Sequence, residues 1–283
     1  MLVWVLDLPI SLLTALLSEY LHLTDLSRLD SAVCCKTHRK SLLTVFNNEM
    51  FCISKTLHGY IEINSILLTW LNLKNIAIEA VKLKGHLLST SFIQYIKYNG
   101  YRIKYLNLNM DKYDSITVST MKTIIRQTPN LIEILNLPIN FLTKHTIQLL
   151  KQSCINIKSL QLITIDHSNT NIIGIELLFN NIFITLINLE IQDCLNFSKS
   201  FQIFNYIHNI KNIQILKLNN LTQYGDEICI ELGKYCYNLK HLYIYNIINN
   251  YSNSTNIITE NAFIGLSKNC LNLLILELLN SVQ

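Results

Sequence analysis

A short pattern of apolar and variable positions recurs eight times along this chain. Each copy has an apolar residue, two variable residues, a second apolar residue, one variable residue and a third apolar residue. The first positions of successive copies lie 25 to 34 residues apart. Because a repeat of this length cannot bury its own apolar face, the pattern predicts a stack of repeats with a shared core. The copies are Leu73-Ile76-Ile78, Ile103-Leu106-Leu108, Ile132-Leu135-Leu137, Ile157-Leu160-Leu162, Leu186-Leu189-Ile191, Ile213-Leu216-Leu218, Leu239-Leu242-Ile244 and Leu273-Leu276-Leu278.

Segments with helical spacing lie between these copies. Their apolar residues stand three and four positions apart, as in Met121, Ile124 and Ile125, which places one apolar stripe on a helix. Each repeat is therefore predicted to run through a strand, a turn, a helix and a return, with parallel strands on one face and helices on the other. Residues that can cap the helix N-termini precede or open several of these segments. They are Thr117 or Ser119, Thr143, Ser198, Asp226 and Thr259.

The middle apolar position of the pattern is Leu in seven copies, and Ile76 is the exception. Equivalent positions of neighbouring parallel strands lie side by side. We therefore expect these leucines to form one buried ladder. Its members are Leu106, Leu135, Leu160, Leu189, Leu216, Leu242 and Leu276.

Three repeats enter their strand through one pattern of Cys, a variable residue, Asn and an apolar residue. It occurs at 154–157, 236–239 and 270–273, and the repeat from Leu186 ends in Cys194. On these residues the chain resembles the leucine-rich repeat proteins, specifically the cysteine-containing subtype of F-box substrate receptors, over roughly residues 66–283. The other repeats depart from the terminal cysteine. The resemblance implies an α/β fold, a right-handed solenoid shaped as a horseshoe with a parallel sheet on its concave face.

Residues 5–45 resemble an F-box. Three short helices are predicted in about 40 residues, because Pro9 marks a helix start and Thr24 or Asp25 precedes the next helix. Residues 46–65 are predicted to be a linker or N-terminal cap. Ser11, an extra residue before Tyr20, and Thr37 or His38 depart from the F-box pattern. The positions that match it in order are Leu8-Pro9, Tyr20-Leu21, Asp25-Leu26, Leu29 and Val33-Cys34.

The F-box resemblance implies that the chain is the substrate-recognition subunit of a Skp–cullin–F-box ubiquitin ligase. Its partners would be a Skp-type adaptor with the cullin complex and a captured protein, and it would not be an enzyme. The alternative is a leucine-rich scaffold without a ligase, whose N-terminal helices only cap the solenoid. An exposed apolar patch would favour the adaptor. The adaptor-binding candidates are Leu8, Pro9, Leu12, Leu16, Tyr20 and Leu26.

The captured protein is expected on the sheet face opposite the core, because strand residues alternate between faces. Tyr243 and Tyr245 alternate along one strand, and aromatic residues with polar tips are enriched at binding hot spots. The alternative is an ordinary solvated sheet face. The candidates are Asn107, Asn136, Gln161, Glu190, Lys217, His241, Tyr243 and Tyr245.

Composition and charge narrow the classes of protein to which this chain could belong. Half of the residues are apolar and 15% are charged, against about 25% charged in an average domain. The net charge of +4 is scattered, which argues against a nucleic-acid partner. No apolar run reaches membrane-spanning length, so we expect no membrane partner. The N-terminus lacks the basic region of a signal peptide, so we expect a cytoplasmic protein, with the nucleus as a second possible compartment.

No residues predict catalysis, a metal or a cofactor. The eight cysteines include no Cys-x-x-Cys, and Cys35-x-x-His38 has no second pair at zinc spacing, so we expect buried structural thiols. Asp166, His167 and Ser168 are consecutive, and consecutive residues cannot converge as a triad. The polar stretch 246–256 is predicted to be a protruding loop. The chain ends five residues after Leu278, which suggests a fragment or an end covered by a partner.

Overall fold

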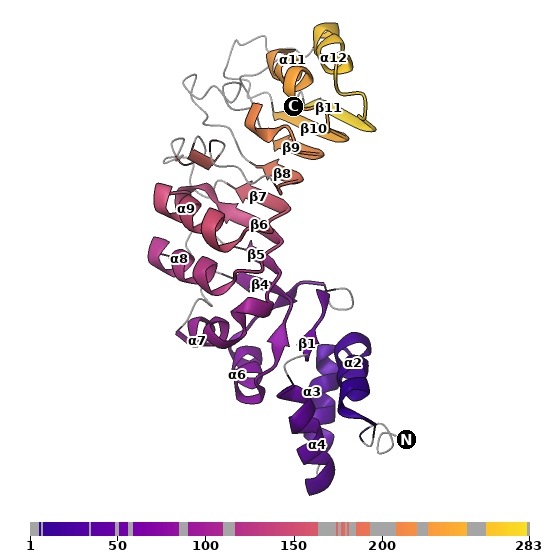
Figure 1. Cartoon of the computed structure of the whole chain (residues 1–283), viewed down its shortest axis with the longest axis vertical. Coiled ribbons are helices and arrows are strands. Elements are labelled where there is room, and N and C mark those ends of the chain that lie inside the picture. Colours follow the sequence, from indigo (N-terminus) through magenta and orange to yellow (C-terminus); the bar gives the residue numbers. More distant parts are fainter. Residues whose placement is uncertain are drawn as a thin grey trace. The chain divides into compact units, whose positions relative to one another are not determined.

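The computed structural model has an α/β architecture whose main sheet contains nine parallel strands (Figure 1). It describes residues 6, 8–33, 35–48, 51–55, 59–84, 90–109, 117–163, 174, 177–178, 180, 185–192, 208–219, 226–247 and 259–281. Five predictions fall wholly or partly outside these residues: the cap at Ser198, the terminal Cys194, the Asp166-His167-Ser168 group, Cys34 and the predicted loop from residue 248 onward. Within the described part of the chain, no helix is both long and apolar enough to cross a membrane.

The strand order of the main sheet is β11-β10-β9-β8-β7-β6-β5-β4-β2, and β1 pairs with β3 separately. The chain divides into two compact units, which are described in turn. The first comprises residues 1–109 and 114–131, and the second comprises 110–113 and 132–283.

The first unit begins with the three short helices that the sequence predicts. Thr117 caps α8 by accepting a hydrogen bond from the Thr120 N–H, as expected. Asn64 caps α6 in the same way. The elements are α2 (Ile10–Tyr20), α3 (Leu23–Ala32), α4 (Lys36–Phe46), β1 (Cys52–Ile53), β2 (Ile61–Glu62), α6 (Ser65–Lys74), β3 (Ala77–Ile78), β4 (Ala80–Lys84), α7 (Thr90–Asn99), η2 (Gly100–Arg102), β5 (Tyr105–Asn109) and α8 (Val118–Gln127).

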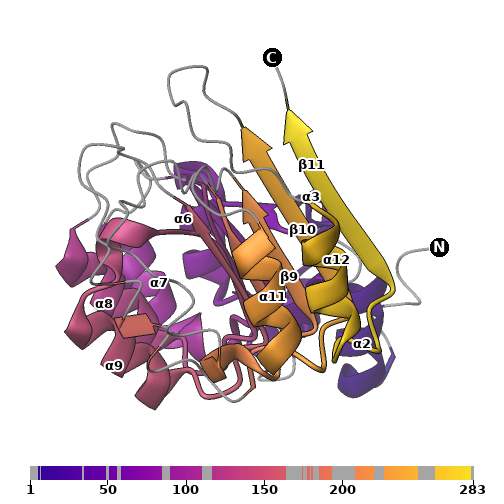
Figure 2. The same cartoon turned by 90° about the horizontal axis from the view of Figure 1, so that it is seen from above.

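The second unit alternates strands with helices. Helices α9, α11 and α12 lie along one face of its strands (Figure 2). Thr143 and Thr259 cap α9 and α12, as predicted. The elements are β6 (Glu133–Pro138), η3 (Ile139–Phe141), α9 (Lys144–Ser153), β7 (Ser159–Ile163), β8 (Asn188–Ile191), β9 (Ile215–Asn219), α11 (Asp226–Tyr235), β10 (His241–Ile247), α12 (Glu260–Ser267) and β11 (Ile275–Ser281). Strand β10 therefore includes the first two residues of the stretch predicted to be a loop.

The predicted leucine ladder is confirmed in four strands of the second unit. Leu160 pairs with Leu189, Leu189 with Leu216, and Leu216 with Leu242, and none is more than 2% exposed. Leu276 continues the register, but its side chain is half-buried. In the first unit, Leu106 is 1% exposed in β5. Close packing of these side chains makes the core that the repeat period implies.

The prediction that Leu135 belongs to the buried ladder is wrong. Ile134 pairs with Leu160 and is 2% exposed, whereas Leu135 is half-buried. The register shifts between Ile134 and Leu137, and Asn136 adopts the left-handed conformation at φ 56°. This is a β-bulge, in which one extra residue moves the side chains before it to the other face.

The first predicted strand is also displaced. Val81 and Leu83 of β4 pair with Leu106 and Leu108, so the main sheet does not use Ile76 or Ile78 there. Ile78 pairs with Ile53 in the separate sheet of β1 and β3. Both segments alternate apolar residues, and only the bend at Glu79 between β3 and β4 separates them.

Three buried thiols occupy equivalent repeat positions, as expected. Cys229 is buried elsewhere, in α11, and Cys35 is exposed, so the expectation of a buried thiol is wrong for Cys35. Cys154 and Cys236 are fully buried and Cys270 is 5% exposed. The Cys270 thiol lies 3.3 Å from the Cys236 carbonyl oxygen, to which it donates. These cysteines fill the interior as small, nearly apolar side chains.

Candidate functional site

Alternate residues of the second unit's strands form the face of the sheet that the helices leave uncovered. We call this the open face. Its central row pairs Gln161 with Glu190, Glu190 with Lys217, Lys217 with Tyr243, and Tyr243 with Glu277. The first four side chains of this row are half-buried. The predicted candidates of β7 to β10 are therefore neighbours on one surface.

The charges of the open face lie at its centre. The Lys217 ammonium is 3.9 Å from the Glu190 carboxylate, and their side chains are 41% and 21% exposed. Gln192 donates a hydrogen bond to the same carboxylate. The Lys217 nitrogen also lies 5.2 Å from the centroid of the Tyr243 ring. A long, half-exposed ion pair contributes little stability, so both groups remain able to engage a ligand.

Three aromatic side chains adjoin these charges on β10. The Tyr243 and Tyr245 rings are stacked with centroids 6.4 Å apart and planes 19° apart, and His241 lies 6.4 Å from Tyr243. The Tyr245 hydroxyl donates a 2.7 Å hydrogen bond to Glu277, which raises the pKa of Tyr245. The contacts hold the rings as an ordered apolar surface with polar tips.

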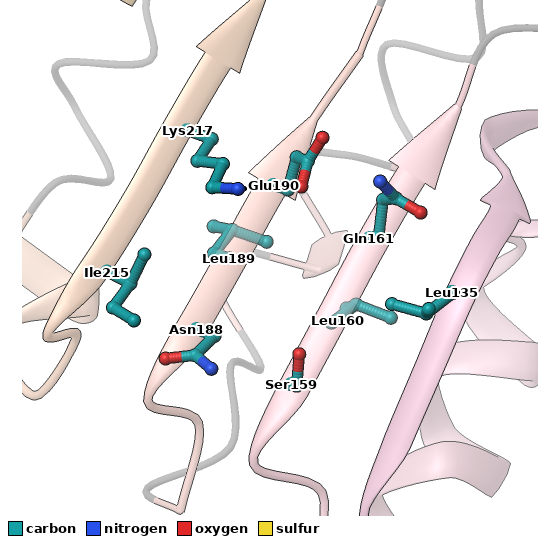
Figure 3. A pocket seen from close by; sticks show the side chains of 9 residues that line it. All are labelled: Leu135, Ser159, Leu160, Gln161, Asn188, Leu189, Glu190, Ile215 and Lys217. Carbon is teal, nitrogen blue, oxygen red and sulfur yellow. Dashed lines mark ion pairs between the residues drawn. The ribbon is translucent and has the colours of Figure 1, made fainter. Parts of the chain in front are cut away.

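A small cavity of about 140 Å³ opens beside the charged pair (Figure 3). Its polar lining comes from Ser159, Gln161, Asn188, Glu190 and Lys217. Its apolar wall includes Ile215 and the Leu135 side chain, which the bulge places here instead of in the core.

The hydrogen bonding of the cavity is incomplete. The Gln161 amide oxygen accepts a 3.1 Å hydrogen bond from the Asn136 backbone N–H, which orients that amide. The Asn188 Oδ1 atom is buried and has no hydrogen-bond partner, and neither has Asn219 Oδ1. A buried acceptor without a partner is costly to the fold.

Two residues predicted to bind the captured protein, Asn136 and Asn107, differ from that prediction in role or in position. Asn136 enters the cavity network through its backbone, because its left-handed conformation directs the N–H at Gln161. Asn107 lies on β5 of the first unit, where it pairs with Lys82. Asn188 and Glu277 were absent from the candidate set, although the strand register that selected Gln161 and Tyr243 also selects their positions.

A second exposed apolar surface lies on α2. Leu13 and Leu17 face the interior, whereas Leu12 and Tyr20 are 49% and 69% exposed. Pro9 and Ile10 are also exposed, and Leu8 and Leu16 are half-buried. We call Pro9, Leu12, Leu16 and Tyr20, which are spaced three and four residues apart, the α2 stripe. Ile10 is exposed at the helix start but lies on the side of Leu13 and Leu17.

Leu26, an adaptor-binding candidate, is fully buried in α3. The exposure expected for it is therefore wrong. Leu26 and Leu29 share the inward face of this amphipathic helix, and burial of both supports the packing of α3.

The N-terminal helices pack against the first repeat through Asp30. Its carboxylate lies 2.7 Å from Arg39 on α4 and 3.3 Å from Lys74 on α6, and it accepts a 3.1 Å hydrogen bond from Trp70 Nε1. Phe46 of α4 contacts the Trp70 ring edge-on. These contacts fix α3, α4 and α6 together.

The described residues contain no group of three or more His, Cys, Asp or Glu side chains that could hold a metal ion. Burial raises the pKa of Cys154 and Cys236 to about 12 each, so both thiols are protonated at neutral pH. A protonated, enclosed thiol is a poor metal ligand and nucleophile.

No protein-family model matches this chain, and no curated protein matches it. The surfaces described above therefore carry the functional interpretation.

Proposed function

We propose that this chain is a protein-binding receptor built as a right-handed leucine-rich repeat solenoid, a horseshoe with the open face on its concave side. The repeat of strand and helix and the parallel sheet support this fold. The observation that carries the function is the gathering of Glu190, Lys217, Tyr243 and Tyr245 on one exposed surface. Aromatic and charged side chains of this kind dominate protein interfaces.

We further propose that the receptor belongs to a Skp–cullin–F-box-type ubiquitin ligase and acts in the cytoplasm or nucleus. The α2 stripe would dock a Skp-type adaptor, since an exposed apolar helix face gains free energy when a partner covers it. The chain would perform no chemistry itself. It would hold the captured protein near the transferred ubiquitin, which is catalysis by proximity.

The adaptor proposal is tested with the full chain and a purified Skp-type adaptor. Leu12→Asp places a charge in the α2 stripe and should abolish complex formation in isothermal titration calorimetry. Ser11→Asp adds the same charge to an exposed polar position of the same helix and should bind normally. Both variants should keep the wild-type circular dichroism spectrum. Absence of binding by the unmutated chain would end the ligase proposal.

The alternative function is a leucine-rich scaffold whose N-terminal helices only cap the solenoid. The Asp30 contacts favour it, because they join α3 and α4 to α6 without a partner. A scaffold would show no adaptor binding but would still bind its partner through the open face. Binding by the open face without adaptor binding would therefore select this alternative.

A further inference from the structure

The open face is acidic, although the chain as a whole has a net charge of +4. Among the described residues of β6 to β11, the charged side chains on this face are three carboxylates and one ammonium. They are Glu133, Glu190, Glu277 and Lys217. A charged surface attracts partners of complementary charge, so the open face favours a basic segment of a captured protein.

The carboxylates Glu190 and Glu277 differ in their surroundings. Glu190 already accepts a hydrogen bond from Gln192 and pairs with Lys217 (Figure 3). Glu277 is exposed, and within the described part of the chain it forms no ion pair. The hydrogen bond from the Tyr245 hydroxyl reaches one of its oxygens, Oε2. Because a carboxylate can accept about four hydrogen bonds, Glu277 can pair with a basic side chain and keep its bond from Tyr245.

The aromatic rings beside Glu277 provide a second attraction for a cation. Tyr243 pairs with Glu277 across β10 and β11, which run side by side (Figure 2). The stacked Tyr245 ring extends the same aromatic surface. The chain's own Lys217 already lies 5.2 Å from the centroid of the Tyr243 ring, within the distance of about 6 Å at which a cation is attracted to a ring. The rings therefore suit a group that is both cationic and able to stack.

We propose that Tyr243, Tyr245 and Glu277 bind an arginine side chain of the captured protein, an assignment that rests on the proposed receptor function. The guanidinium lies against the tyrosine rings and donates two hydrogen bonds to the Glu277 carboxylate. Arginine fits better than lysine, because the guanidinium is planar, stacks on aromatic rings and matches a carboxylate with parallel N–H groups. The lysine ammonium is a compact, strongly hydrated charge that does not stack.

The test is selection of short random peptides displayed on phage against the immobilised full chain. Each selected peptide is then synthesised, and its Kd for the wild type and for Tyr243→Ala is measured by fluorescence polarisation. We expect peptides whose Kd rises about tenfold or more with Tyr243→Ala, and these should share an arginine at one position. Replacing that arginine by lysine should weaken binding about threefold or more, because stacking and the paired hydrogen bonds are lost.

The matched variant is Glu277→Gln, which removes the charge and keeps an acceptor for the Tyr245 hydroxyl. It should raise the Kd of the arginine peptide about fivefold. A peptide with citrulline, which is planar and of similar shape but uncharged, should bind the wild type and Glu277→Gln equally, because the cycle isolates the charge pair. The control is Glu227→Gln, at an exposed position of α11, which should change neither Kd.

Circular dichroism spectra show whether the variants fold. Should Tyr243→Ala fail to fold, Tyr243→Leu gives the same comparison, because leucine keeps apolar bulk on the strand and removes the aromatic ring.

The outcomes separate the two proposals. Peptides that depend on Tyr243 overturn the arginine assignment and leave the receptor function standing if they have no shared arginine, bind equally well with lysine, or lose no affinity to Glu277→Gln. Selection of no peptide, or only of peptides that bind Tyr243→Ala as tightly as the wild type, overturns both.

Discussion

The bulge in β6 makes a sharp prediction about stability. The repeat pattern assigns Leu135 to the core, whereas the structure buries Ile134 to 2% exposure and leaves Leu135 half-buried beside the open-face cavity. Ile134→Ala and Leu135→Ala should therefore differ in their cost, although they are adjacent and remove similar groups.

The expected magnitudes follow from burial. Ile134→Ala leaves a cavity against Leu160 and should lower the free energy of unfolding by about 3 kcal/mol, within the range for buried aliphatic residues. Leu135→Ala removes a side chain that already contacts water and should cost about 1 kcal/mol. The difference of about 2 kcal/mol corresponds to roughly a 30-fold change in the ratio of folded to unfolded chain.

Urea denaturation followed by circular dichroism measures both values. Leu189→Ala is the positive control, because Leu189 is 1% exposed and the repeat pattern and the structure agree on it. The m-values should match that of the wild type, so that midpoint shifts report stability. If Leu135→Ala costs as much as Ile134→Ala, the register of β6 is the one that the repeat pattern implies, and the bulge is refuted.

Two further predictions concern packing and pH. Gly233→Ala should destabilise the chain by about 1–3 kcal/mol in thermal melts, because the added Cβ would lie 1.9 Å from the Gly265 carbonyl oxygen. Lys234→Ala, at an exposed position, is the control. Equal melting temperatures of the two variants would contradict the close approach of α11 and α12. Burial disfavours the Glu79 carboxylate, but the Lys55 N–H and the Lys104 ammonium outweigh burial and lower its pKa below the ordinary 4.5. The ionised Glu79 should therefore stabilise the fold above pH 4.5, and this contribution should be lost as pH falls through the folded-state pKa of Glu79. Glu79→Gln should accordingly be less stable than the wild type at pH 7 and equally stable well below that pKa.

Local physics made much of the fold predictable. The apolar residues of β7 to β10 sit in one unbroken register at Leu160, Leu189, Leu216 and Leu242, because each strand has only one face that can be buried. The caps at Thr117, Thr143 and Thr259 were predictable for the same local reason: a short side-chain oxygen satisfies an orphan N–H.

The open face was predictable only in part. Strand alternation alone places Glu190, Lys217, Tyr243 and Tyr245 on the same side of the sheet. Alternation does not determine which atoms lack partners. The unsatisfied Asn188 oxygen and the fixed Gln161 amide depend on neighbours 25 or more residues away, so they emerge only when the strands are paired.

The remaining differences were decided by tertiary structure. Ile134 and Leu135 are both apolar, and so are Ile78 and Val81, so the pattern of apolar residues cannot choose between them. The choice depends on which neighbouring strand each segment pairs with, and a shift of one residue moves a side chain to the opposite face. Leu26 is buried, and its helix α3 contacts α6 through Asp30 and Trp70, which lie 40 residues apart in sequence. The sequence by itself determined the period and the faces of the repeats, whereas long-range packing determined which of several apolar residues occupies the core.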